Sequence, residues 1–213
     1  KKFNLMINRR LAYEPISKII NKKSFWKDDF FVNQFVLDPR PETEILIEES
    51  QKIFFNNTRN IKILDIGTGS GAIAISLARE FKNADILAID ISEDAIKVAD
   101  KNIREKKLHN RIKLEKTTIN RINDNFDLIV SNPPYLTNKE LKNISKEIRN
   151  FEPLISLDGG KDGLNFYREF AKKIPKIMNF NAYFITEIGA KQYDHCREIF
   201  RVSSLKFEKK IKD

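Results

Sequence analysis

The chain of 213 residues has few of the residues that build disulfides, metal sites and membrane spans. Its single cysteine, Cys196, excludes an internal disulfide, and two histidines, His109 and His195, are a poor supply of metal ligands. No run of consecutive apolar residues is longer than four, whereas a membrane-spanning helix needs about 20. We therefore expect no metal, no membrane contact and a reducing, cytoplasmic setting. We also expect His109 and His195 on the surface, Cys196 in a helix, and none of the three in catalysis.

Long runs of one charge are absent as well. The net charge is +9, yet no run of lysine or arginine is longer than two. A basic balance is compatible with a nucleic-acid or ribosomal partner. Dispersed positive charge, with frequent lysine, isoleucine and asparagine, is equally typical of chains translated from A/T-rich genomes. The charge leaves both interpretations open.

From residue 61 onward, short apolar runs alternate with amphipathic stretches. This alternation predicts an α/β fold, in which a parallel sheet carries helices on both faces. The predicted strands are residues 61–66, 84–89, 111–115, 126–130, 182–186 and 204–209. The predicted helices are residues 41–55, 72–81, 92–106, 138–150, 164–178 (bent or shortened at its end by Pro175) and 191–200. Ahead of them, residues 1–24 hold two short amphipathic stretches, and an aromatic β-hairpin is predicted within residues 25–36.

A glycine-rich loop follows the first strand of the sheet. Its sequence, Gly67-Thr68-Gly69-Ser70-Gly71, lies between a strand and a helix, where glycines allow a ligand to approach the backbone. Asp90 ends the next strand about twenty residues on, where a carboxylate binds ribose hydroxyls. The pattern also fits a dinucleotide fingerprint, but Asp65 is better suited to the cationic amino-acid end of S-adenosylmethionine than to a pyrophosphate.

A second cluster follows the strand at 126–130. Asn132, Pro133, Pro134 and Tyr135 combine a side-chain acceptor, two prolines that fix the backbone, and an aromatic face. Such a cluster can hold a planar –NH2 group. We expect Asn132 Oδ1 and the Pro133 carbonyl to accept its two N–H bonds, while Tyr135 packs against its plane. Orientation of this kind makes a poorly nucleophilic amide nitrogen reactive without a strong base. This cluster favours methyl transfer over hydride transfer.

Taken together, these motifs resemble the N5-glutamine methyltransferases of peptide chain release factors. The resemblance extends over nearly the whole chain. It is carried by RLAYEPISKIINKKSFW at 10–26, DPRPETE at 38–44, the glycine loop, Asp90, SNPPY at 131–135, FEPLISLDGGKDGLNFYRE at 151–169 and EIGAKQ at 187–192. SNPPY alone is shared with enzymes that methylate amino groups of adenine or guanine, whereas the RPETE and DGGKDGLNFYR stretches are more specific. Sister enzymes that methylate a ribosomal-protein glutamine carry a different Arg-Pro region.

The resemblance implies a Rossmann-like class I methyltransferase sheet of seven strands with helices on both faces. It implies that residues 25–213 form the methyltransferase domain, lacking its last strand, and that residues 1–24 end a helical region that docks the substrate.

The family's site residues carry over onto matching positions of this chain. The donor, S-adenosyl-L-methionine, is expected at Asp65, Gly67, Thr68, Gly69, Ser70, Gly71, Asp90, Thr117, Thr118 and Asn132, with S-adenosyl-L-homocysteine as product. Thr117 and Thr118 replace an acidic–aromatic pair that is common in the family, which puts adenine contacts there in doubt. The implied substrate is the glutamine of a release factor's Gly-Gly-Gln loop, held by Asn132, Pro133, Pro134 and Tyr135. We expect a monomer that meets nucleic acid only through the ribosome or a fused second domain.

Two alternatives remain at this stage. The first is an amino-methyltransferase acting on a nucleic-acid base or on a ribosomal-protein glutamine, favoured by SNPPY and the charge of +9. The second is a binding module without activity, favoured by Thr117-Thr118 and by the incomplete ends that the resemblance implies.

Overall fold

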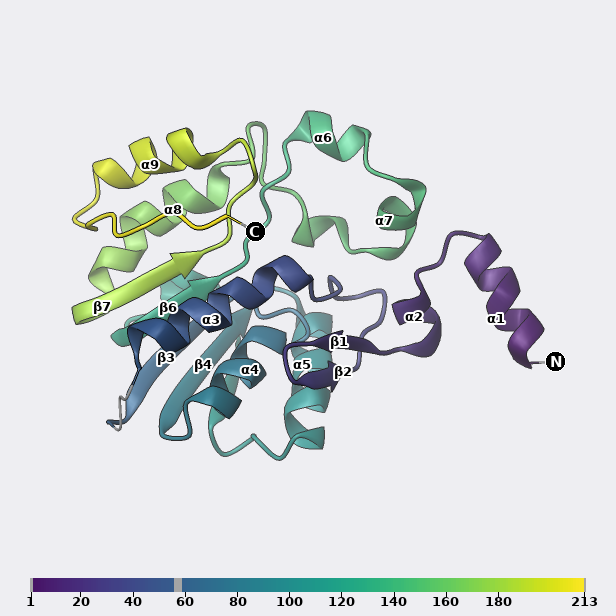
Figure 1. The fold of residues 1–213 in the computed structure, drawn as a ribbon. Helices are drawn as coiled ribbons and strands as arrows, with labels where there is room; N and C mark the ends of the chain where they lie inside the picture. Colours follow the sequence, from purple (N-terminus) through teal and green to yellow (C-terminus); the bar gives the residue numbers. More distant parts are fainter. Residues whose placement is uncertain (1, 56–58, 213) are drawn as a thin grey trace.

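The centre of the protein is a parallel sheet of five strands, seen in a computed structural model that describes residues 2–55 and 59–212. The strand order is β5-β4-β3-β6-β7, and every neighbouring pair is parallel (Figure 1). The strands are β3 (Ile61–Ile66), β4 (Ala84–Asp90), β5 (Ile112–Lys116), β6 (Phe126–Ser131) and β7 (Met178–Thr186). The α/β class predicted from the alternating pattern is confirmed.

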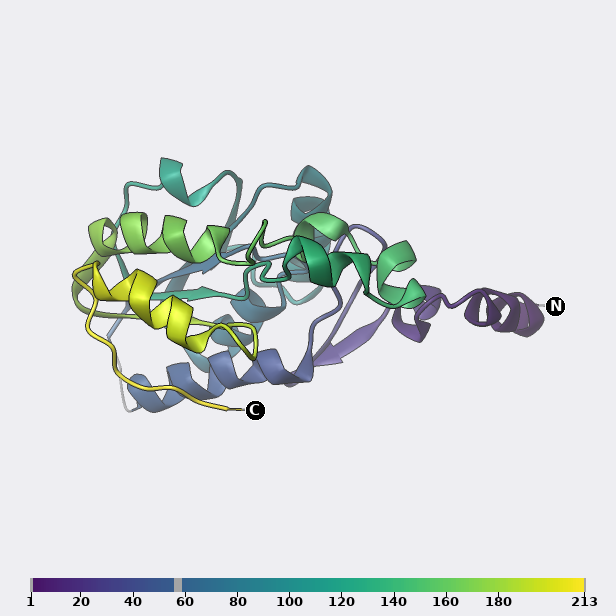
Figure 2. The same ribbon diagram turned by 90° about the horizontal axis from the view of Figure 1, so that it is seen from above.

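Helices cover both faces of this sheet. In β3 only Lys62 is exposed, as expected for a central strand buried on two sides. Its residues alternate between two cores. Ile61 and Ile63 pack with α3 (Glu44–Ile53), α4 (Ala72–Glu80) and α5 (Glu93–Glu105). Leu64 and Ile66 pack with α8 (Asn165–Lys173) and α9 (Tyr193–Arg201), on the opposite side (Figure 2).

The direction of strand order changes at β3. From β3 the chain adds β4 and β5 on one side and then β6 and β7 on the other. Ligands of open α/β sheets bind beyond the carboxyl ends of the strands at this point. The glycine loop follows β3 and the Asn132–Tyr135 cluster follows β6, which pairs with β3 directly. The topology therefore brings the two predicted motifs to one place.

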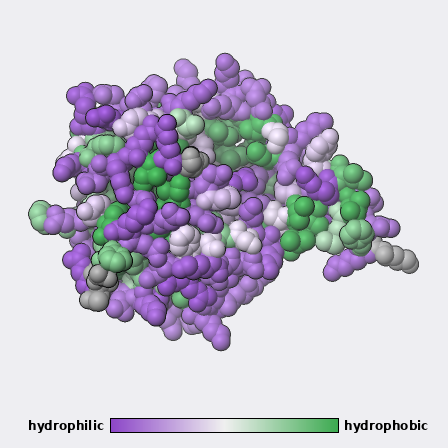
Figure 3. Space-filling model, viewed as in Figure 1, coloured by the Kyte–Doolittle hydropathy of each residue, from purple (hydrophilic) through white to green (hydrophobic). Residues whose placement is uncertain are grey.

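The N-terminal part stands apart from the sheet. Helix α1 (Lys2–Leu11) projects from the body and leads through α2 (Ile16–Ile20) into the hairpin of β1 (Lys23–Phe25) and β2 (Asp28–Phe30). The hairpin is shorter and earlier than the predicted 25–36, because Trp26, with φ 53°, turns the chain. Figure 3 shows apolar side chains on the projecting part, where Phe3 is 71% and Leu11 73% exposed.

The stretch predicted as one helix at 138–150 is two helices. These are α6 (Asn138–Lys142) and α7 (Lys146–Phe151). The first ends at Lys142 with Asn143 as its C-cap, and Ser145 caps the second, because its side chain accepts the Ile148 N–H. Pro175 shortens the helix predicted at 164–178, as expected: α8 ends at Lys173, and a short 3-10 turn, Ile174–Lys176, follows.

The sheet has five strands in the described part of the chain, not the seven implied by the resemblance. The strand predicted at 204–209 is wrong, since this segment has no strand pairing in the structure. Its alternation of apolar and polar residues has another cause. Phe207 packs edge-on against Tyr193, and Lys209 forms an ion pair with Glu49, which is buried in α3. The segment is thus attached to helices by side chains rather than to the sheet by its backbone.

Candidate active site

The glycine loop lies in a left-handed conformation that opens its backbone. Gly67 and Gly69 have φ angles of 74° and 55°. A Cβ added at Gly67 would meet no other atom within 4 Å, so this side of the loop has room for a ligand. Gly67 N donates to the Ile89 carbonyl at 2.9 Å, which fixes the loop against the end of β4. Ser70 and Thr68, in contrast, have buried side chains.

Asp90 is held by two backbone N–H groups at the end of β4. Its Oδ2 accepts from Gly69 N at 2.9 Å, and its Oδ1 accepts from Ser92 N at 2.9 Å. Burial raises the pKa of this carboxyl, while the two backbone donors oppose the shift. Asp90 is thus fixed beside the glycine loop. Thr117 lies next to it, because Thr117 N donates to the Asp90 carbonyl at 3.0 Å, and the exposed Thr118 follows.

Asp65 lies behind the loop rather than on its open side. The residue is 0% exposed, and its Oδ2 accepts from Thr68 Oγ1 at 2.7 Å and from Ala74 N at 3.2 Å. Burial raises the pKa of Asp65 to about 7. Its Oδ1 has no hydrogen-bond partner among the described residues. In this position Asp65 fixes the loop through Thr68 and the start of α4 through Ala74.

Asn132 is turned in a definite direction. Its Nδ2 donates to Thr43 Oγ1 at 2.8 Å, and Thr43 Oγ1 donates to Glu187 Oε2 at 2.7 Å. Oδ1 of Asn132 therefore faces away from Thr43, and the described residues offer it no hydrogen-bond donor. This is the oxygen predicted to accept an N–H of the substrate. Pro133 is buried and Pro134 half-buried next to it.

Tyr135 is fixed at both its ring and its backbone. Its hydroxyl donates to Glu187 Oε1 at 3.1 Å, and Gln192 Nε2 donates to its carbonyl at 2.8 Å. Burial, assisted by Glu187, raises the pKa of Tyr135 to about 12, so the phenol keeps its proton at neutral pH. A Cβ added at Gly163, where φ is 75°, would lie 2.4 Å from the Tyr135 carbonyl oxygen. The glycine of this loop thus lets it approach the cluster closely.

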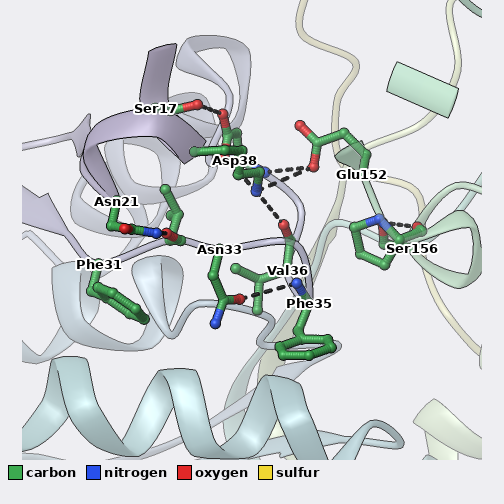
Figure 4. Close-up of polar contacts among 12 residues, drawn as sticks. Ser17, Asn21, Phe31, Asn33, Phe35, Val36, Asp38, Glu152 and Ser156 are labelled. Carbon is green, nitrogen blue, oxygen red and sulfur yellow. Dashed lines mark hydrogen bonds and ion pairs between the residues drawn. The ribbon is translucent and has the colours of Figure 1, made fainter. Parts of the chain in front are cut away.

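A buried group of charges links the N-terminal region to Asp38 and Glu152 (Figure 4). Lys18 Nζ, on α2, lies 2.7 Å from Asp38 Oδ1 and 3.5 Å from Glu152 Oε2, and it donates to the Val36 carbonyl at 2.6 Å. Arg40 contacts Glu152 from its exposed side at 3.3 Å. Burial raises the pKa of Glu152, while Lys18 opposes the shift. The cluster joins α2, the segment that leads to Thr43, and the chain after α7.

Comparisons with known proteins agree with this geometry. A family model described as "Methyltransferase domain" matches residues 57–203. A release factor glutamine methyltransferase from Buchnera aphidicola subsp. Baizongia pistaciae (strain Bp) is 41% identical over 197 residues, which are 92% of this chain and 70% of that protein. The chain belongs to the release factor glutamine methyltransferases.

A longer relative and a solved structure differ in what they share with this chain. A bifunctional methyltransferase from Rickettsia felis (strain ATCC VR-1525 / URRWXCal2) is 36% identical over 99% of this chain, which spans only 45% of that longer protein. The crystal structure of a ribosomal protein L11 methylase from Lactobacillus delbrueckii subsp. bulgaricus has a TM-score of 0.59 at 21% identity. It covers 83% of this chain and 77% of its own, and it shares the fold.

Several residues of this methyltransferase site were missed when only the sequence was read. Thr43, Glu187 and Gln192 all contact the Asn132–Tyr135 cluster. The sequence did contain an indication, since Thr43 lies in the DPRPETE stretch and the other two lie in EIGAKQ, and both stretches carry the family resemblance. Their role could not be assigned because they come from distant segments. The expected positions of His109, His195 and Cys196 are confirmed: both histidines are exposed, and Cys196 is buried in α9.

Residues 2–55 and 59–212 carry neither a metal-binding cluster nor a membrane-spanning helix. That part of the chain holds no cluster of three or more histidine, cysteine, aspartate or glutamate side chains suited to a metal ion. Within the same residues, no helix has the length and apolar character needed to cross a membrane.

Proposed function

We propose that this chain methylates the side-chain amide nitrogen, N5, of the glutamine in the Gly-Gly-Gln loop of a peptide chain release factor. The donor is S-adenosyl-L-methionine and the product S-adenosyl-L-homocysteine. One observation carries the proposal. Asn132 follows β6, next to the open glycine loop that follows β3, and its Oδ1 meets no hydrogen-bond donor among the residues that the structure describes. The groups that would bind a planar amide and a methyl donor thus lie together, at the point where the strand order changes direction.

The residues present fit the donor. Backbone groups of Gly67, Gly69 and Gly71 would line it, and Asp90 would accept from its ribose hydroxyls. Asp65, with Oδ1 lacking a hydrogen-bond partner, would favour the cationic amino-acid end through the loop. Thr117 and Thr118 border the adenine side, next to Asp90. When bound, S-adenosylmethionine supplies a methyl carbon on a positively charged sulfur.

The acceptor side is built from the second cluster. Asn132 Oδ1 and the Pro133 carbonyl accept the two N–H bonds of the substrate amide and hold its nitrogen toward the donor side. The same two acceptors stabilise the positive charge that develops on nitrogen. Tyr135, which keeps its proton, and Pro134 pack along the amide plane. The nitrogen loses one proton to solvent after methylation, when it has become acidic, so no strong base is required.

The proposal includes the setting of the reaction. Residues 1–24 belong to the region that docks the release factor, and the chain acts as a monomer in the cytoplasm, where release factors work. An amino-methyltransferase for a nucleic-acid base is the second candidate, because the SNPPY motif and the charge of +9 would serve it too.

Incubation with a methyl-labelled donor tests the proposal directly. We expect label on a purified release factor and none on the same factor with Gln→Ala in its Gly-Gly-Gln loop. Equal labelling of both factors would contradict the proposal. Label in added RNA or DNA, with binding that weakens steeply as salt rises, would favour the second candidate.

A further inference from the structure

Three consecutive hydrogen bonds link Asn132 to Tyr135 through residues from two other segments. Asn132 Nδ2 donates to Thr43 Oγ1 at 2.8 Å, Thr43 donates to Glu187 Oε2 at 2.7 Å, and Tyr135 donates to Glu187 Oε1 at 3.1 Å. Thr43 is 4% exposed, so water has little access to the middle of this relay. The relay engages the –NH2 end of the Asn132 amide.

The chemistry of the groups sets the direction of every bond in the relay. The carboxylate of Glu187 offers acceptors only, so the hydroxyls of Thr43 and Tyr135 must donate to it. A hydroxyl has a single hydrogen, and that of Thr43 is used on Glu187. Thr43 can then only accept from Asn132, which requires the –NH2 end of the amide. Oδ1 is left pointing the other way.

We propose that Thr43 and Glu187 are positioning residues that fix which end of the Asn132 amide faces the substrate nitrogen. An asparagine amide can rotate by half a turn with little change in shape. Asn132 would then present its own N–H, a donor, to the substrate N–H, which needs an acceptor. The relay removes this wrong orientation. The inference rests on the proposed function, and it gives the DPRPETE and EIGAKQ stretches a positioning role at that same site.

The backbone supports of both residues are independent of the relay. Glu187 N donates to the Ser131 carbonyl at 3.1 Å, and Tyr167 Oη donates to the Glu187 carbonyl at 3.1 Å. Thr43 lies in a short 3-10 turn, Pro41–Thr43, whose first residue has its φ fixed by the proline ring. Side-chain substitutions should therefore alter the relay while the backbone keeps its course.

Three variants test the relay: Thr43→Val, Thr43→Ser and Glu187→Gln. Valine keeps the shape of threonine and removes the hydroxyl, and we expect kcat for release-factor methylation to fall about 10-fold or more, less than for loss of a group that contacts the substrate directly. The dissociation constant for S-adenosylhomocysteine, measured by calorimetry, should stay within about two-fold. Thr43→Ser restores the hydroxyl and should recover activity to within about three-fold of the original chain.

Glu187→Gln tests the direction of the bonds. Its side-chain amide can donate to Thr43, which releases the threonine hydrogen toward Asn132 and favours the reversed amide. We expect a loss of kcat similar to that of Thr43→Val. Glu198→Gln is the matched control, because Glu198 is 67% exposed on α9 and pairs with Arg201 at the surface, and it should leave the rate unchanged.

A double-mutant cycle separates positioning from a general structural role. If Thr43 acts through Asn132, Thr43→Val should cost nothing further in a chain that already carries Asn132→Ala. Full additivity of the two losses, or a Thr43→Val chain as active as the original, would overturn the inference. Absence of glutamine methylation by the unaltered chain would instead overturn the proposed function, so the two failures are distinguishable.

Discussion

At the scale of single residues, the site uses ordinary side chains whose effect depends on what surrounds them. Asn132 and Asp65 show this clearly. The amide of Asn132 has one end bound and one end available, whereas the carboxylate of Asp65 is fully buried behind the glycine loop. The first should matter for the rate of methylation and the second for the dependence of stability on pH.

Asn132→Ala should separate chemistry from donor binding. We expect binding of S-adenosylhomocysteine to stay nearly intact, because the glycine loop and Asp90 are untouched. Turnover should fall by about 10²-fold or more, the usual loss for an oriented polar contact that acts in the transition state. Steady-state kinetics with a release factor measures the rate, and calorimetry measures the binding. A variant with close to the original rate would refute the assigned role.

Asp65→Asn should make stability less dependent on pH. Burial raises the pKa of Asp65 to about 7, compared with about 3.9 in an unfolded chain. The folded state thus binds this proton more tightly than the unfolded state, and stability from this group is lost as pH rises from about 4 through about 7. We expect the unfolding free energy of the original chain to fall by on the order of a few kcal/mol more than that of Asp65→Asn between pH 5 and pH 8. Parallel pH profiles of the two proteins in thermal or urea unfolding would contradict this.

At the scale of elements, two ion pairs of equal length differ strongly in burial. Lys18 and Asp38 lie 2.7 Å apart with side chains 3% and 5% exposed. Lys22 and Asp29 also lie 2.7 Å apart, with side chains 56% and 48% exposed. The first pair joins α2 to the segment that carries Thr43, and the second lies on the surface of the hairpin.

Lys18→Met should therefore destabilise the protein strongly. It leaves the carboxylates of Asp38 and Glu152 buried without their main cation, at a cost of about 3–5 kcal/mol. Lys22→Met is the matched control and should cost less than about 1 kcal/mol, as exposed pairs do. Urea unfolding measures both free energies. Similar losses for the two variants would show that burial does not set the value of these pairs.

At the scale of the whole molecule, the projecting helix α1 lies well away from the sheet and its site (Figure 1). Its exposed apolar residues would therefore contact surfaces of the release factor that are distant from the Gly-Gly-Gln loop. The proposed docking role of residues 1–24 thus concerns affinity for the intact release factor rather than the chemical step.

The paired change Phe3→Ser and Leu11→Ser tests this role. These residues are 71% and 73% exposed, so folding should be unaffected. We expect KM for an intact release factor to rise about 100-fold, since each of the two buried apolar side chains is worth about 1.5 kcal/mol, while kcat stays unchanged. A short Gly-Gly-Gln peptide should react as before. Val202→Ser, at an equally exposed residue after α9, is the control, and an unchanged KM for the paired variant would exclude the docking role.

The sequence by itself determined the α/β class, most strand positions and both site motifs. Nearly continuous apolar runs, as in 61–66, specify central parallel strands, and glycine or proline clusters mark the loops that follow them. The local pattern gave a wrong prediction where the same side chains could serve either a strand or contacts with helices. The alternation at 204–209 suits a strand, yet Phe207 and Lys209 attach to Tyr193 and Glu49 on helices.

Only the tertiary structure decided how the site is oriented. Hydrogen-bond direction depends on which groups meet, and Thr43, Asn132 and Glu187 meet although 89 residues separate the first two along the chain. Burial likewise depends on the surrounding elements, and the sequence did not show that Asp65 is fully buried behind the loop. Residue identity supplies the chemistry, and the packed fold sets its direction and its electrostatic surroundings.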